Sequence, residues 1–157
     1  MKFWVGVMPP KEIFDEILKI QEEIANKYNT YYSLENRIGP HVTISFQKSI
    51  EEKSLKQVED IIDACRSEPF KVTVQGVGRF YKTNTIYMGV KSKELKKLNK
   101  CLVSRLRQFG EISLPRKRFT GHITVAYEDV KKEDFQEYSR NSKRETFFMN
   151  FLQIEYT

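Results

Sequence analysis

The sequence predicts an α+β fold built from two similar lobes. Strand-like and helix-like patterns follow the order strand, helix, strand, helix, strand, and the same order then occurs a second time. In addition, residues 41–46 and 122–127 share one pattern: His, an apolar residue, Thr, an apolar residue, a small residue and an aromatic ring. We therefore expect a duplicated unit with pseudo-two-fold symmetry, in which two antiparallel sheets flank a central cleft and the helices lie outside.

The first half of the chain contains the elements of one unit. Phe3–Met8 reads as a strand that stops at two prolines, and isoleucines at spacings of three and four then predict a helix. Residues 26–32 read as a loop before the first histidine strand. Ser49 and Glu52 form a capping-box pattern, which predicts the start of a helix that extends to Cys65.

The second half repeats this order. An alternating pattern predicts a strand over Phe70–Phe80, with a bend or bulge at Gly76 and Gly78. A turn and a strand over Thr85–Val90 follow, and a leucine stripe then predicts a helix that ends at Gly110. After the second histidine strand, a short charged helix over residues 131–142 and one final strand over residues 145–156 complete the prediction.

Length and composition favour a single domain over residues 1–157. The apolar stretches are too short for a membrane span or a signal peptide, so we expect a cytoplasmic protein, and we expect a monomer. Cys65 and Cys101 read as reduced core residues, with a disulfide between them as the less favoured alternative. Residues 1–78 carry a net charge of −2 and residues 79–157 one of +8, which indicates anionic substrates as readily as a solvated lysine-rich surface.

His41 and His122 are the only histidines of the chain, and each stands two residues before a threonine. Residues i and i+2 of a strand share a face, so His41 would lie beside Thr43, and His122 beside Thr124. The same alternation places Ser45 and Ala126 on these polar faces. Paired imidazoles can take and give protons near neutral pH, and hydroxyls can donate hydrogen bonds to oxygens that gain charge. This combination suits phosphodiester cleavage without a metal or other cofactor, although two buried structural histidines would give the same pattern.

The two His-x-Thr motifs resemble those of the 2H phosphoesterase superfamily, in particular the 2′-5′ RNA ligase-like proteins, also called RNA 2′,3′-cyclic phosphodiesterases. The residues Phe3–Pro9 also resemble the first strand of that family. The resemblance implies a bilobal α+β fold with a central cleft. It also implies metal-independent hydrolysis of a 2′,3′-cyclic phosphate, on an RNA end or a nucleotide, to a 2′-phosphate.

Carried over residue by residue, the resemblance makes His122 the base that activates water and His41 the acid that protonates the leaving O3′. Thr43 and Thr124 would bind the phosphate oxygens. Tyr127 stands where many relatives have arginine, so the substrate-binding set includes Tyr127 and Arg118, with Arg116 as a further candidate in place of the missing arginine. Gly121 stands where many relatives have proline.

Other functions remain open at this stage. The chain could cleave or ligate 2′-5′ linkages, or it could bind RNA or nucleotides without catalysis. A metal-dependent phosphatase is disfavoured because no acidic cluster accompanies the histidines. Arg116, Lys117 and Arg118 could clamp RNA phosphates or form a solvated face, and Phe80 and Tyr81 could stack a base, although a core or rim position is the more common role.

Overall fold

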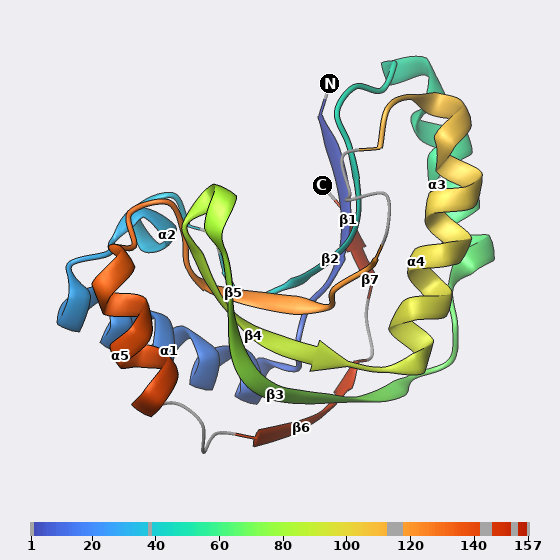
Figure 1. The fold of residues 1–157 in the computed structure, drawn as a ribbon. Coiled ribbons are helices and arrows are strands. Elements are labelled where there is room, and N and C mark those ends of the chain that lie inside the picture. Colours follow the sequence, from blue (N-terminus) through green and yellow to red (C-terminus); the bar gives the residue numbers. More distant parts are fainter. Residues whose placement is uncertain (1, 38, 113–117, 142–145, 152–153, 157) are drawn as a thin grey trace.

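In the computed structural model, helices pack on the two outer sides of a pair of antiparallel sheets, as Figure 1 shows. The structure describes residues 2–37, 39–112, 118–141, 146–151 and 154–156. The elements follow in the order β1 (Phe3–Val7), α1 (Lys11–Tyr28), α2 (Tyr32–Glu35), β2 (Val42–Gln47), α3 (Leu55–Cys65), β3 (Phe70–Phe80), β4 (Thr85–Lys91), α4 (Lys93–Leu106), β5 (His122–Ala126), α5 (Lys132–Asn141), β6 (Thr146–Phe151) and β7 (Ile154–Tyr156).

The two sheets confirm the predicted α+β class and its two-sheet architecture. One sheet has the strand order β2-β1-β7 and the other the order β5-β4-β3-β6, and all the pairings are antiparallel. The histidine strands β2 and β5 each form one edge of a sheet, and these two edges contact each other. The two histidine strands therefore meet where the two sheets approach each other.

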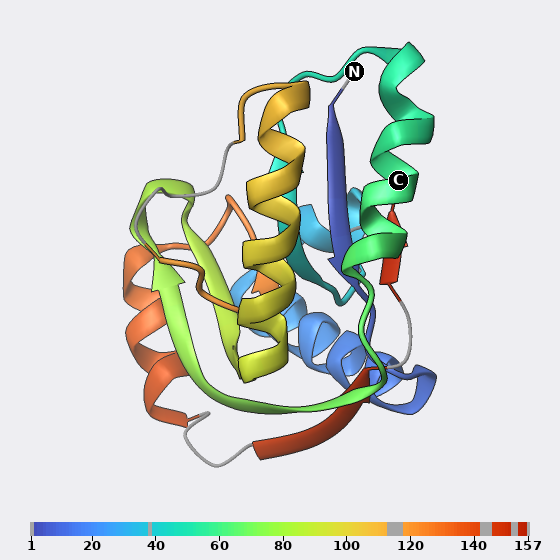
Figure 2. The same ribbon diagram turned by 90° about the vertical axis from the view of Figure 1, so that its right-hand side faces the viewer.

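Each long helix packs against the histidine strand of the other half of the chain. The helix α1 follows β1 but contacts β5, and α4 follows β4 but contacts β2. The apolar stripes on both helices make these contacts possible, because Ile17 and Ile24 of α1 and Leu95 and Leu102 of α4 are all buried. In Figure 2, α3 and α4 stand side by side next to β1. The two halves of the chain thus share one core.

The C-terminal segment differs from the prediction of one strand over residues 145–156. It forms two strands, of which β6 pairs with β3 in the larger sheet and β7 pairs with β1 in the smaller one. Aromatic and β-branched residues predict strand, but they do not say which sheet each part joins. The chain therefore links the two sheets at this end, and β7 completes the sheet that the first half of the chain begins.

The helix starts also differ in part from the sequence analysis. The predicted capping box is wrong: a 3₁₀ turn over Glu52–Ser54 delays the α-helix to Leu55, and no side chain caps either start. Ser49 lies too many residues before Leu55 for its side chain to cap the first turn of the α-helix. By contrast, the Oγ of Ser92 accepts hydrogen bonds from the backbone N–H groups of Glu94 and Leu95 at the start of α4. The four-residue helix α2 was not predicted.

The two cysteines correct another expectation. Cys65 of α3 and Cys101 of α4 form a disulfide, rather than the two reduced thiols that the sequence favoured. Their Cα atoms lie 5.9 Å apart, because the two helices pack side by side. The bulge predicted near Gly76 is confirmed, since the register of β3 and β4 shifts between Val74 and Val77 and Gly76 has a φ of +75°. Within the described residues, no helix is long and apolar enough to cross a membrane.

Candidate active site

The two histidines hold the same local conformation at matching places in the two lobes. The Nδ1 of His41 lies 2.8 Å from the carbonyl oxygen of Gly39, and the Nδ1 of His122 lies 2.8 Å from that of Thr120. A carbonyl can only accept, so each Nδ1 carries the proton and donates it. In a neutral imidazole the lone pair then belongs to Nε2, which can exchange a proton with a ligand.

The two imidazoles also influence each other electrostatically. Burial lowers the pKa of His122 below its usual value, and the charge of His41 lowers this pKa further, while the hydrogen bond to Thr120 opposes the shift. The charge on His41 therefore favours the neutral form of His122.

The two threonines follow their histidines on the same strand faces. Thr43 pairs with Gly6 of β1, and Thr124 pairs with Tyr87 of β4. Both threonines are half-buried, and neither hydroxyl forms a hydrogen bond to another described residue. These hydroxyls are therefore available to a ligand that carries hydrogen-bond acceptors.

Each histidine strand contains a bulge at the third residue after the histidine. In β2, Thr43 and Ser45 lie opposite consecutive residues of β1, which leaves Ile44 as the extra residue, and Val125 is the extra residue in β5. A bulge reverses the alternation of faces beyond it. Ser45, paired with buried Val5, therefore leaves the face of the histidine.

The bulges overturn part of the alternation predicted from the sequence. Ala126 pairs with buried Ile86, so it faces the core, as Ser45 does. Phe46 pairs with Trp4 and joins the face of Thr43, instead of the opposite face. On each histidine strand, the threonine is therefore the last polar residue of the face that carries the histidine. In β2, the aromatic ring of Phe46 comes next on that face.

Aromatic rings hold both imidazoles, and the sequence analysis missed two of the three. The ring of Trp4 lies with its centroid 4.9 Å from that of His41. Phe80 and Tyr87 meet the ring of His122 edge-on, at centroid distances of 4.8 and 5.4 Å. Aromatic residues are common in strands, so Trp4 and Tyr87 do not stand out in the sequence. Only their places on β1 and β4, the strands that pair with the histidine strands, could have indicated contact with the imidazoles.

Two glycines make room for these rings. A Cβ atom at Gly6 would overlap the ring of Trp4, and one at Gly78 would overlap the ring of Tyr87. Gly121, where proline is common in the family that the sequence resembles, lies against the backbone of β4. A Cβ atom there would lie 2.6 Å from the carbonyl oxygen of Val90. Small residues at these points let the aromatic rings and the strand end approach closely.

Two amide side chains support the histidine strands from the other half of the chain, and the sequence did not predict them. The Nε2 of Gln21 in α1 donates to the carbonyl oxygen of Thr124 over 2.9 Å. The Nδ2 of Asn99 in α4 donates to the carbonyl oxygen of Ile44 over 2.7 Å. Both acceptors lie at the bulges on sheet edges, where backbone groups lack strand partners.

Tyr127 and Arg118, the other predicted site residues in the described part of the chain, form no ring contact or hydrogen bond with either histidine. Tyr127 contacts Tyr32 of α2, with ring centroids 5.6 Å apart, and burial raises the pKa of its hydroxyl, with Glu128 adding to the shift. Arg118 is exposed, and no contact joins it to either histidine within the described part of the chain. Arg116 and Lys117 lie outside the described residues.

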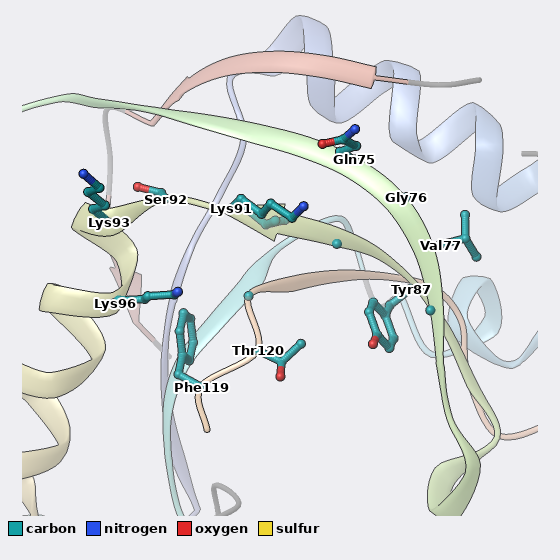
Figure 3. A pocket seen from close by; sticks show the side chains of 14 residues that line it. Gln75, Gly76, Val77, Tyr87, Lys91, Ser92, Lys93, Lys96, Phe119 and Thr120 are labelled. Atoms are coloured by element: carbon teal, nitrogen blue, oxygen red, sulfur yellow. The ribbon is translucent and has the colours of Figure 1, made fainter. Parts of the chain in front are cut away.

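A cavity of about 620 Å³ adjoins His122 on the face of the larger sheet. Its lining includes Tyr87, whose ring contacts His122, and Gly89, which pairs with His122 in the sheet. It also includes Thr120 and Gly121, the two residues before His122. Figure 3 shows this cavity with Tyr87 toward one end, Lys96 toward the other, and Thr120 between them. The described residues bring together no cluster of three or more His, Cys, Asp or Glu side chains that could hold a metal ion.

Known proteins share both the sequence pattern and the fold. Residues 9–150 match the sequence model of the 2′-5′ RNA ligase superfamily. A protein of Archaeoglobus fulgidus named RNA 2′,3′-cyclic phosphodiesterase is 27% identical over 111 residues, which are 68% of this chain and 62% of that protein. The match thus spans less than two thirds of that relative's length.

Solved structures with the same fold have low sequence identity to this chain. The crystal structure of TT0787 of Thermus thermophilus superimposes with a TM-score of 0.67 at 17% identity, covering 100% of this chain and 84% of that one. The structure of E. coli LigT complexed with 3′-AMP gives 0.68 at 14% identity, covering 99% and 93%. For the MHV ns2 PDE domain the values are 0.59 and 17%, covering 100% and 99%.

Proposed function

Because this chain belongs to the 2′-5′ RNA ligase superfamily, we propose that it is a phosphodiesterase that hydrolyses 2′,3′-cyclic phosphates to 2′-phosphates with its two histidines. The observation that carries the proposal is the matched pair of imidazoles, each with Nδ1 bound to a backbone carbonyl and Nε2 left for proton transfer. The named Archaeoglobus relative supports the substrate class. RNA ends and nucleotides both carry such a phosphate.

In the proposed reaction, Nε2 of His122 takes a proton from a water molecule while the water oxygen attacks the phosphorus atom. The lowered pKa of His122 favours this assignment, because a neutral imidazole is needed to accept the proton. The bond from phosphorus to O3′ breaks, and His41 gives its Nε2 proton to O3′. The products are a 2′-phosphomonoester and a 3′-hydroxyl group, so atoms and charge balance.

The other site residues would stabilise charge during this step. The hydroxyls of Thr43 and Thr124 would donate hydrogen bonds to the non-bridging phosphate oxygens, which gain charge in the transition state. Arg118 and Tyr127 would contact more distant parts of the substrate. Both histidine motifs belong to one chain, so a monomer carries a complete site.

The test is incubation of a short RNA that ends in a 2′,3′-cyclic phosphate, in buffer with EDTA. We expect the wild type to form a 2′-phosphate end, visible by phosphorus NMR, and His41→Asn and His122→Asn to lose several orders of magnitude in rate. The Asn amide can still donate to the carbonyl of residue 39 or 120 but lacks Nε2, so it separates proton transfer from local structure.

Different outcomes select different functions. Loss of activity in EDTA that returns with added Mg²⁺ or Zn²⁺ would contradict the metal-independent reaction. Turnover of a 2′-5′-linked dinucleotide without turnover of the cyclic phosphate would replace the proposed substrate with that linkage. Tight binding of the RNA without any turnover would identify a binding module.

A further inference from the structure

The cavity beside His122 continues away from the catalytic pair to a group of lysines. Its far end is lined by Lys91 at the end of β4 and by Lys93 and Lys96 in the first turns of α4. We call the part lined by Tyr87, Lys91, Lys93, Lys96 and Phe119 the β4–α4 groove. In Figure 3 the side chain of Lys96 points from α4 toward Phe119.

The charged residues that line the groove are all lysines. The residues that line the cavity include three lysines and no aspartate or glutamate. All three lysines are exposed, and none of them takes part in an ion pair among the described residues. Lys93 also interacts with the carboxylate of its neighbour Glu94. Lysines gathered along one concave surface attract phosphate groups.

The groove also offers aromatic surface. Tyr87 and Phe119 line it. Tyr87 is half-buried, stacks on Phe80 and also contacts the ring of His122. Aromatic side chains between a catalytic group and a cationic patch suit a nucleotide, because a base can stack while its phosphate reaches the lysines. A phosphate ion alone would use the lysines but leave the aromatic surface uncovered.

We propose that the β4–α4 groove binds the nucleotide on the 5′ side of the terminal cyclic phosphate, with Lys91 and Lys96 holding the phosphate that joins the two nucleotides. This inference rests on the proposed function, which places the cyclic phosphate at His41 and His122. A 2′,3′-cyclic phosphate ends an RNA strand, so any further nucleotide lies on its 5′ side. The groove makes the protein prefer an oligoribonucleotide end over a cyclic mononucleotide.

The first experiment measures binding, so that it does not depend on turnover. Adenosine 3′-phosphate and the dinucleotide ApAp, which adds one nucleotide and one internucleotide phosphate, are titrated calorimetrically into wild type and into the Lys91→Ala/Lys96→Ala double variant. We expect the dinucleotide to bind wild type at least about tenfold more tightly than the mononucleotide. In the double variant this gain should shrink to about twofold or less.

Lys97→Ala is the matched control. Lys97 is an exposed lysine of the same helix that does not line the cavity, so it removes the same charge from the same region. The control should keep the full gain of the dinucleotide. Absence of a gain in wild type, a gain that survives in the double variant, or an equal loss in Lys97→Ala would each overturn the groove as a nucleotide subsite.

The second experiment compares hydrolysis of adenosine 2′,3′-cyclic phosphate with that of ApA ending in the same group. We expect the double variant to lower kcat/KM for the dinucleotide about tenfold relative to the mononucleotide. An equal fall for both substrates would assign the lysines to the catalytic centre and overturn the subsite. If neither substrate reacts with wild type while the binding gain is present, the proposed reaction fails and the groove stands.

Discussion

At the scale of residues, the feature that decides the chemistry is the hydrogen bond from each Nδ1 to the carbonyl two residues earlier. The same bond in both lobes fixes the tautomer and turns both Nε2 atoms into proton-exchange groups. The short chain segment between donor and acceptor makes this arrangement local. It is present at both His-x-Thr motifs of this chain.

The pH dependence of the reaction follows from the shifted pKa of His122. A base must be neutral, and burial together with the charge of His41 lowers this pKa, so the residue stays neutral to a lower pH than an ordinary histidine. We expect kcat/KM to be bell-shaped, with its acid limb below pH 6.5. A pH profile of kcat/KM with the cyclic substrate measures this limb, and an acid limb above that value would contradict His122 as the base.

The threonine hydroxyls give a second prediction at this scale. Thr43→Val and Thr124→Val keep the side-chain shape but remove the hydrogen-bond donor. We expect each change to lower kcat by roughly 10²- to 10³-fold, with little change in KM, because the bond strengthens in the transition state.

Serine at the same positions is the control for this prediction. Thr43→Ser and Thr124→Ser keep the hydroxyl and should retain most of the turnover in the same steady-state assay. Valine variants with unchanged kcat would remove the threonines from the proposed charge stabilisation.

At the scale of elements, the bulges and the crossing helices determine how the strands present their residues. The sequence predicted both strands, the histidines at their starts and the threonines on the same face. It could not reveal the bulges, because Ser45 and Ala126 are small enough to fit either face of a sheet. One extra residue in each strand then moved Phe46 to the face that the alternation had assigned to Ser45.

The support from the other half of the chain was also hidden from sequence reasoning. Gln21 lies within an apolar stripe and Asn99 within a charged helix, and neither position has a local signal for a partner more than fifty residues away. Long-range contacts of this kind depend on the packing of whole elements. The same reason explains the disulfide, since the distance between two cysteines is set by the helices that carry them.

The hydrogen bond of Asn99 leads to a prediction at this scale. Asn99→Leu leaves the carbonyl of Ile44 without this donor, and we expect it to lower the free energy of unfolding by about 1–3 kcal/mol and to reduce kcat. Urea denaturation and turnover measure the two effects. Gln108→Leu is the control, because the Gln108 amide bonds only within its own exposed helical turn, and equal effects of the two changes would contradict a specific role for Asn99.

At the scale of the whole molecule, the disulfide between α3 and α4 contributes to stability. The bond closes a loop between residues 36 positions apart. In the loop-entropy treatment, this reduces the conformational entropy of the unfolded chain and stabilises the fold by roughly 4 kcal/mol. We expect reduction with dithiothreitol to lower the melting temperature of the wild type. The Cys65→Ser/Cys101→Ser variant should melt at the same temperature with and without the reductant, and a wild type that ignores the reductant would contradict a stabilising bond.

The packing of α1 on β5 and of α4 on β2 has a consequence for how such a site can arise at all. One repeat alone would lack the helix that supports its histidine strand, and two identical copies could supply it to each other only as a symmetric dimer with one site on its axis. Such a dimer would hold two equivalent histidines, and it would fall apart on dilution. Joining the copies in one chain makes the site independent of concentration. It also frees the two imidazoles from symmetry, so that one can specialise as a base while its counterpart serves as an acid.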